Sequence, residues 1–277
     1  MNFKNALLTA CSNIHINYQA KKILRVRLTN KCNAKCVFCH GENGSNSPPF
    51  IFITLNHLSK ALKHFDQDIA SIALSGGEPF LHPQFFEIAK LCKTIVGSKV
   101  HVNTNAQYLT LDNIESIINA GIENFHINLN TLNHKIYKRD YGISFPRNLP
   151  AILDRIINFG SKATINFVFT KDKTKNDIIK MLSYCRQNNC SLTIINEYHP
   201  SPPFSGLLFQ ARMYETLSTF NYIIDSISPG RIVYRNNKST ICIAAPCAPA
   251  LAWNGGASDN AIVLHENGNF TGFIHEF

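Results

Sequence analysis

Three cysteines stand close together in the segment CNAKCVFC, residues 32–39. Their spacing, C-x3-C-x2-C, suits three irons of a [4Fe–4S] cluster and leaves the fourth iron free to bind a substrate or a cofactor. The alternative is a zinc site completed by a fourth ligand such as His40. Structural zinc usually shows two paired knuckles, and the chain has no second C-x2-C pair, so the spacing favours an iron–sulfur centre.

A second motif, LSGGEP at residues 74–79, joins two glycines to a carboxylate. Gly76 and Gly77 lack a Cβ atom, so the backbone there can approach a ligand closely. Glu78 can accept hydrogen bonds from an ammonium group. The motif follows the cysteines by one strand–helix unit, and the two motifs together are a much stronger signal than either alone.

The elements that must position these residues are strands that alternate with helices. Near-continuous apolar runs predict strands at residues 23–29, 71–74, 100–104, 124–130, 164–170 and 192–197. Helices are predicted at residues 54–65, 83–95, 111–120, 149–159 and 176–188. Thr54 is the expected N-cap of the first helix. Six β-then-α units predict parallel strands, two units short of a closed eightfold barrel.

We therefore expect an α/β fold, a partial (β/α)6 TIM-like barrel with both faces of its sheet covered. Its site should lie at the C-terminal ends of the strands. The pattern changes after Pro200, so we divide the chain into an N-terminal extension (1–20), the barrel (21–200) and a C-terminal extension (201–277). The last region should cover the barrel mouth, and its residues 211–226 read as one helix.

The number of cysteines and the hydropathy indicate in which cellular compartment the protein is found. Nine cysteines are an odd number, which rules out a fully paired disulfide framework, and a chain of 277 residues is too large to need one. We see no signal segment and no run of about 18 apolar residues. We expect a reduced cytoplasmic protein that does not cross a membrane.

The net charge of +9 indicates anionic partners. The lysines and arginines are scattered, so a solvated basic surface is a simpler reading than a nucleic-acid-binding stripe. A small anionic substrate fits the charge equally well.

The two motifs and the six β/α units together resemble the radical S-adenosylmethionine (radical SAM) superfamily. In that superfamily the open iron chelates the methionyl group of S-adenosylmethionine, and an electron from the cluster cleaves the sulfonium. The resulting 5′-deoxyadenosyl radical takes a hydrogen atom from the substrate. An external donor such as flavodoxin or ferredoxin supplies the electron.

The resemblance implies roles for individual residues. Cys32, Cys36 and Cys39 would be the cluster ligands. The residues that would bind S-adenosylmethionine are Phe38, Gly76, Gly77, Glu78, Thr104, Asn128 and His199. Phe38 would lie by the adenine, and the Gly-Gly-Glu segment would hold the methionyl amine. For Thr104, Asn128 and His199, ordinary hydrogen bonding at a strand end is the alternative.

Longer segments resemble one family within this superfamily, the GTP 3′,8-cyclases of molybdenum cofactor biosynthesis. They include LRVRLTNKCNAKCVFCH, LSGGEPFLHPQF and INLNTLNHKIYKRDYG, with LHENGNFTGF near the C-terminus. Several departures argue against the same activity. An arginine usual before the Gly-Gly motif is Ala73, the arginines after the second cysteine pair are missing, and the Gly-Gly tail is replaced by HEF at residues 275–277. A triphosphate site needs several cations, so we expect a divergent relative with another substrate.

In that family a C-x2-C pair and a later cysteine hold an auxiliary cluster. Here Cys242 and Cys247 are separated by four residues, and Phe273 stands near the place of the third cysteine. The pair could hold a second cluster with another ligand, such as the substrate or His265. Because two thiolates rarely hold a cluster, we expect two packed or surface thiols instead.

Substrate contacts are expected where strand ends face the barrel mouth. The cationic candidates are Arg25, Arg27 and Lys31, and the candidates for a catalytic role are Asn130, Asn166 and Glu197. Arg25 and Arg27 share one face of the first strand. If that face is the barrel interior, an anionic substrate follows, and if it is the outer face, the two arginines are merely solvated.

The leading hypothesis is a radical SAM enzyme acting on a small biosynthetic substrate, such as a nucleotide, a nucleoside or a sugar. Peptide modification is an alternative, but relatives with that activity usually carry a cysteine-rich C-terminal domain. The segment CVFCH also suggests a glycyl-radical-enzyme activase, which LRVRLTNKC and the C-terminal extension fit less well. A non-catalytic zinc or nucleic-acid-binding module agrees least with the motifs.

Overall fold

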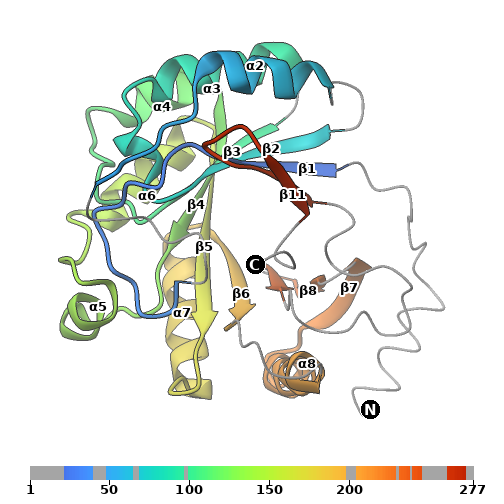
Figure 1. Ribbon diagram of the computed structural model, residues 1–277. Coiled ribbons are helices and arrows are strands. Elements are labelled where there is room, and N and C mark those ends of the chain that lie inside the picture. Colours follow the sequence, from blue (N-terminus) through green and yellow to red (C-terminus); the bar gives the residue numbers. More distant parts are fainter. Residues whose placement is uncertain are drawn as a thin grey trace.

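The computed structural model describes residues 22–39, 48–64, 69–96, 99–197, 204–228, 231–237, 239–244 and 261–272 (Figure 1). Its strands form one mixed sheet in the order β11-β10-β1-β2-β3-β4-β5-β6-β9-β8-β7. None of the helices within these ranges is both long and apolar enough to cross a bilayer.

The centre of the sheet is a run of parallel strands linked through helices. The strands are β1 (Lys22–Arg27), β2 (Ile69–Ser75), β3 (Lys99–Thr104), β4 (Ile122–Asn128), β5 (Lys162–Phe169) and β6 (Ser191–Asn196). The helices are α2 (Leu55–His64), α3 (Phe85–Val96), α4 (Ile114–Asn119), α5 (His134–Tyr141), α6 (Leu149–Asn158), α7 (Lys175–Gln187) and α8 (Phe204–Ser218), with a 3-10 turn η1 (Pro79–Leu81). This arrangement confirms the predicted partial barrel.

The two faces of the sheet differ in polarity, which the near-continuous apolar runs of the sequence did not predict. Leu24, Val26 and Leu74 are fully buried on the outer face, where α2, α3, α4 and α6 lie (Figure 1). The residues that alternate with them are Arg25, Arg27, Ser71, Ala73 and Ser75. Only the outer face is an apolar core, and the inner face, turned away from the helices, is polar.

The C-terminal region adds strands to both edges of the barrel sheet. These strands are β7 (Ile223–Ser228), β8 (Arg231–Arg235), β9 (Thr240–Ala244), β10 (Ala261–Leu264) and β11 (Phe270–Gly272). β9 pairs in parallel with β6, and β10 pairs in parallel with β1. Each edge of the six-stranded barrel sheet is therefore extended by a parallel strand from the C-terminal region.

One predicted helix was wrong at its C-terminal end. The segment 211–226 is not a single helix, because α8 ends at Ser218 and β7 begins at Ile223. Between them Asn221 has φ +60°, in the left-handed region, which interrupts the helical path. Pairing of β7 with β8 then outweighs the local helical pattern. The N-cap prediction is confirmed, since Thr54 Oγ1 accepts a hydrogen bond from His57 N at 3.1 Å.

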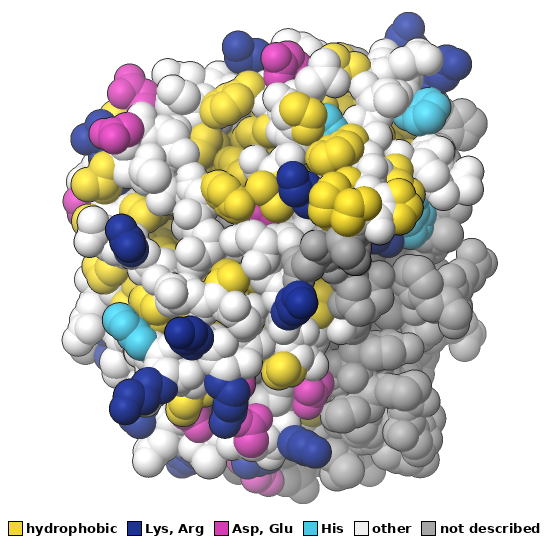
Figure 2. Space-filling model, turned by 60° about the vertical axis from the view of Figure 1, so that its left-hand side comes forward, with side chains coloured by type: hydrophobic (Ala, Val, Ile, Leu, Met, Phe, Trp, Pro, Cys, Tyr) yellow, Lys and Arg dark blue, Asp and Glu magenta, His cyan; other side chains and the backbone are white. Residues whose placement is uncertain are grey.

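The distribution of charge on the surface agrees better with a solvated basic surface than with a nucleic-acid-binding stripe. Figure 2 shows lysine and arginine side chains spread over the described part of this face, with aspartates and glutamates between them. They do not gather into one basic stripe on that face, which agrees with a solvated surface.

Candidate active site

The cysteine segment forms a loop directly after β1. Cys32 and Cys36 are half-buried, and Cys39 is exposed. Burial, together with the neighbouring Cys39 and Cys32, raises the pKa of Cys36 to about 12. Burial also raises the pKa of Cys32, and such thiols become thiolates when a cationic centre binds them. The donor set therefore fits a metal centre.

Within the described ranges no group of three His, Cys, Asp or Glu side chains is arranged closely enough to hold a metal ion. A [4Fe–4S] cluster takes one thiolate on each of three irons, so the choice between a cluster and a zinc site stays a prediction from the spacing of the three cysteines.

The C-terminal end of α5 holds this loop in place. Lys35 N donates to Tyr141 O and Val37 N donates to Asp140 O, each at 2.9 Å. The Phe38 ring packs edge-on against Tyr141, with 5.0 Å between ring centroids. The sequence analysis missed α5. Its signals were Asn133, whose side chain caps the helix, and Gly142, which ends it at φ +69°.

The Gly-Gly segment is packed against the cysteine loop. Gly77 N donates to Thr29 O at 2.7 Å, and Glu78 N donates to Lys31 O at 2.8 Å. A Cβ atom at Gly77 would lie 2.1 Å from Lys31 O, and one at Gly76, where φ is +128°, would lie 2.5 Å from Thr29 O. The glycines are therefore required for contact between the two motifs, and their predicted contact with a ligand stays a prediction.

Glu78 is a buried carboxylate with neutral partners. It is 1% exposed, Thr104 Oγ1 donates to its Oε1 at 2.7 Å, and Asn105 N donates to its Oε2 at 3.0 Å. Burial raises the pKa of Glu78 to about 7, although these hydrogen bonds act to lower it. No lysine or arginine in the described part of the chain pairs with Glu78. Such a carboxylate fits a ligand that brings its own ammonium group.

Asn105 is a site residue that the sequence analysis missed. Besides its bond to Glu78, its Nδ2 donates to Asn33 Oδ1 at 2.8 Å, so it ties the carboxylate to the cysteine loop. The available signal was its position directly after Thr104, at the C-terminal end of β3. Thr104 itself positions Glu78 and caps the turn by accepting from Ala106 N at 3.0 Å.

Asn128 and Asn166 lie side by side on the inner face of β4 and β5. Asn166 Nδ2 donates to Asn128 Oδ1 at 3.5 Å. Glu197, after β6, accepts from Lys171 N at 3.3 Å. His199 lies outside the described residues.

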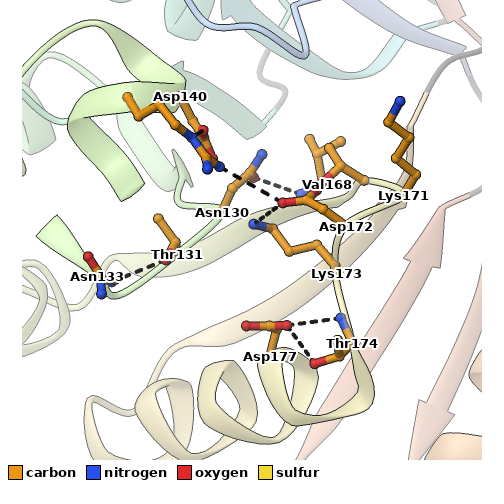
Figure 3. A network of polar contacts seen from close by, with 12 residues as sticks. Asn130, Thr131, Asn133, Asp140, Val168, Lys171, Asp172, Lys173, Thr174 and Asp177 are labelled. Atoms are coloured by element: carbon orange, nitrogen blue, oxygen red, sulfur yellow. Dashed lines mark hydrogen bonds and ion pairs between the residues drawn. The ribbon is translucent and has the colours of Figure 1, made fainter. Parts of the chain in front are cut away.

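Asn130 does not join this group. Its Oδ1 accepts from Val168 N at 2.9 Å, so it fastens the end of β4 to β5 (Figure 3). It lines a separate pocket of about 330 Å³ together with Thr131, Asn133 and Asp177, which lies between the loop before α5 and the helix α7. These contacts show a structural role for Asn130, and its assignment as a catalytic candidate stays a prediction.

The three predicted cations have different surroundings. Arg25 and Arg27 alternate with the fully buried Leu24 and Val26, so both belong to the inner face. Arg27 forms an ion pair with Glu266 at 3.3 Å, which offsets its charge. The Lys31 ammonium group lies over the Phe50 ring, 5.0 Å from its centroid.

The other cysteines are free thiols wherever the structure describes them. Cys242 lies on β9, and Arg231 Nη1 approaches its sulfur at 4.0 Å. Cys247 lies outside the described residues. Cys92 and Cys185 are buried in the core, as expected of small apolar side chains.

A partial α/β barrel with three cysteines after its first strand and a Gly-Gly-Glu segment after its second defines a class of enzymes. The family model described as Radical SAM superfamily matches residues 26–185, more than half of the chain, so the chain belongs to the Radical SAM superfamily. Members of this superfamily are enzymes.

Among curated proteins, the chain is similar to a probable GTP 3′,8-cyclase of Methanococcus maripaludis. The two are 29% identical over 184 residues, which cover 65% of this chain and 59% of the relative. A second relative is an AdoMet-dependent heme synthase of Methanosarcina barkeri, 32% identical over 140 residues, or 48% of this chain and 38% of that one. The chain spans less than two thirds of the length of these relatives.

Solved structures confirm the fold. SuiB of Streptococcus suis, bound to its precursor peptide SuiA, matches with a TM-score of 0.66 at 17% identity and covers 96% of this chain and 62% of its own. Methylornithine synthase matches with a TM-score of 0.54 at 14% identity, covering 65% and 55%. At these identities the likeness concerns the fold alone.

Proposed function

We propose that this chain binds a [4Fe–4S] cluster and S-adenosylmethionine and uses them to abstract a hydrogen atom from a small substrate. The observation that carries this proposal is the pair of backbone hydrogen bonds between the Gly-Gly-Glu segment and the cysteine loop. The buried Glu78 carboxylate acts electrostatically on Cys32 and Cys36, which supports a common site. Such a site would hold a metal cluster together with a ligand that has an ammonium group.

Each residue then has a role. Cys32, Cys36 and Cys39 would hold the cluster, which when bound supplies the electron that cleaves S-adenosylmethionine. Glu78 would accept the methionyl ammonium group, with Thr104 and Asn105 fixing the carboxylate. The remaining contacts to S-adenosylmethionine would come from Phe38, Gly76, Gly77, Asn128 and His199.

The substrate would be a small biosynthetic molecule with an anionic group. Ala73 and the missing C-terminal arginines argue against GTP, although the curated relatives carry the name of a GTP cyclase. Peptide modification is supported only by the fold of SuiB. A flavodoxin or ferredoxin of the reducing cytoplasm would supply the electron, and Cys242 and Cys247 would remain thiols.

Iron content after anaerobic reconstitution tests the cluster. We expect about four irons and four sulfides per chain, with the broad absorbance near ~400 nm of a [4Fe–4S] centre. Cys36→Ala should lose the cluster, because two thiolates cannot hold it. Cys92→Ala, which removes a buried thiol far from the loop in sequence, is the matched control and should keep all four irons.

Two other outcomes would contradict the proposed iron–sulfur chemistry. Zinc in place of iron in protein purified without oxygen would refute the iron–sulfur site. Eight irons per chain would show that Cys242 and Cys247 do hold a second cluster.

A further inference from the structure

The pocket of about 330 Å³ that Asn130 lines, named here the outer pocket, lies between the loop before α5 and the helix α7. Its wall includes Phe167 of β5 and Met181 of α7, which are both buried. Phe167 alternates along β5 with Asn166 of the inner face, so the pocket lies on the other side of the sheet from the barrel interior. Its described lining residues include none of the cysteine loop or of the Gly-Gly-Glu segment.

Apolar side chains form much of the wall of the outer pocket. Phe167 and Met181 are joined there by Leu132 and Ile136, which are half-buried. Pockets that bind small molecules have volumes of about 300–1,000 Å³ and combine mostly apolar walls with a few polar groups. The outer pocket lies at the lower end of this range, so it suits a small molecule with an apolar part.

Asn130 contributes a buried amide group to the same wall. Its side chain is 1% exposed, and its Oδ1 accepts the hydrogen bond from Val168 N (Figure 3). Its Nδ2 is buried and has no hydrogen-bond partner among the described residues. Because buried donors are rarely left unpaired, Nδ2 indicates that an acceptor is missing, such as an oxygen atom of a ligand.

Two opposite charges, Asp177 and Lys180, line the pocket from one side of α7. Thr174 N and Oγ1 both donate to Asp177 Oδ2, at 2.9 and 2.7 Å, and the other carboxylate oxygen points away from Thr174 (Figure 3). Lys180 forms no ion pair with an acidic side chain of the described residues. Each of the two charges can therefore receive a group of a ligand.

Asp177 is ionised at neutral pH. Burial acts to raise its pKa, but the hydrogen bonds from Thr174 and the charges of Lys173 and Lys180 outweigh burial and lower the pKa. The outer pocket thus presents a carboxylate and an ammonium group beside its apolar wall.

We propose that the outer pocket binds a free amino acid with an apolar side chain. The ammonium group of the ligand would lie at Asp177 Oδ1, its carboxylate at Lys180 with Asn130 Nδ2 as a further donor, and its side chain against Phe167 and Met181. A carboxylate alone would bring a like charge to Asp177, and an amine alone would bring one to Lys180. Only a ligand with both groups matches both side chains. This inference goes beyond the proposed function and does not depend on it.

Three probes with the same branched tail test this assignment by isothermal titration calorimetry of the full chain. Leucine carries both charged groups, 4-methylpentanoate lacks the ammonium group, and 3-methylbutylamine lacks the carboxylate. We expect one leucine to bind per chain, about tenfold or more tighter than either analogue, because each analogue loses a charge-assisted hydrogen bond.

Variants of α5 and α7 locate the binding. Lys180→Met should weaken the binding of leucine about tenfold or more without weakening that of 3-methylbutylamine. Lys175→Met, the same substitution at the first residue of α7 and outside the pocket, is the matched control and should bind leucine like wild type. Ile136→Trp should fill the pocket and block leucine. Equal melting temperatures would show that the variants are folded.

Three results would overturn the proposal. They are the absence of leucine binding to wild type, equal affinity of wild type for leucine and 4-methylpentanoate, and unchanged affinity for leucine in Lys180→Met. The last result would show that leucine binds elsewhere on the chain, for example at Glu78.

Discussion

Glu78 is a single residue whose surroundings suit a positively charged ligand. Its carboxylate sits in a buried position where its partners are a hydroxyl group and a backbone N–H, with no side-chain cation among the described residues. In the absence of a ligand the neutral acid is therefore favoured, as the pKa near 7 indicates. An incoming ammonium group would reverse that preference.

Glu78→Gln should change stability in a way that depends on pH. Because the folded pKa of about 7 exceeds the ordinary value of 4.5, the stability that the neutral carboxyl group gives is fully present below pH 4.5 and is lost as the pH rises through 7. Glutamine does not titrate. In cluster-loaded protein without S-adenosylmethionine, the unfolding free energy of the variant relative to wild type should rise by about 2–3 kcal/mol from pH 5 to pH 8.

Urea unfolding at the two pH values measures this change. Glu115→Gln, on the exposed face of α4, is the control and should show no comparable dependence on pH. A Glu78→Gln effect of the same size at both pH values would contradict the buried, cation-free carboxylate.

At the scale of elements, α5 links the barrel to the cysteine loop. Its last residues accept hydrogen bonds from Lys35 N and Val37 N, and the Tyr141 hydroxyl accepts from Asn130 N at 2.9 Å. Tyr137 and Tyr141 stack with 3.9 Å between ring centroids and are fully buried. The helix therefore holds the loop from one side while the Gly-Gly segment holds it from the other.

Tyr141→Phe should weaken this support. It leaves the buried Asn130 N–H without its acceptor, which should lower the unfolding free energy by about 1–3 kcal/mol. The bound iron should also be lost faster to a chelator, because the loop opens more often. Tyr184→Phe on α7, which removes a hydroxyl group without a hydrogen-bond partner among the described residues, should do neither. Unchanged chelation and stability in Tyr141→Phe would show that α5 does not support the loop.

The sequence identifies the strands and most helices of the barrel because their patterns are local. Gly121 and Gly160, for example, follow two of the predicted helices and have positive φ. The sequence could not reveal α5, whose stability comes from Tyr137 and Tyr141 packed in the core more than from an apolar stripe. It also could not reveal β7, because pairing with β8 overrides the helical pattern of 211–226.

The candidate site was predictable only in part. Cys32, Cys36, Cys39 and Glu78 stand in recognisable motifs. The contact of Gly77 with Lys31 joins residues far apart in the sequence and needed the fold. The sequence correctly indicated that Asn130 lies at a strand end. Only the hydrogen bond from Val168 N to its side chain shows that it fastens two strands together.

At the scale of the whole molecule, the C-terminal region adds strands to both edges of the barrel sheet. β10 pairs with β1, and the following loop brings Glu266 to Arg27. Both side chains are about nine-tenths buried, so each charge depends on the other. His265 adds a second contact to the same guanidinium group at 3.2 Å.

Glu266→Ala should therefore destabilise the fold by about 2–4 kcal/mol, because it leaves the Arg27 charge buried without its partner. Replacing Arg27 by Met in the same chain should restore much of the loss. Asp225→Ala breaks the more exposed pair with Arg235 and should cost less than about 1 kcal/mol. Thermal unfolding of the four proteins measures these differences, and equal losses for the two single variants would contradict the coupling across β1 and β10.

The most direct test of the central claim is the reductive cleavage of S-adenosylmethionine. Cluster-loaded protein, kept without oxygen and reduced with dithionite, should convert S-adenosylmethionine into 5′-deoxyadenosine, which chromatography with mass detection measures. Cys92→Ala should do the same, and Cys36→Ala should form none. Wild type with a full complement of iron that forms no 5′-deoxyadenosine, or Cys36→Ala that still forms it, would contradict the assignment.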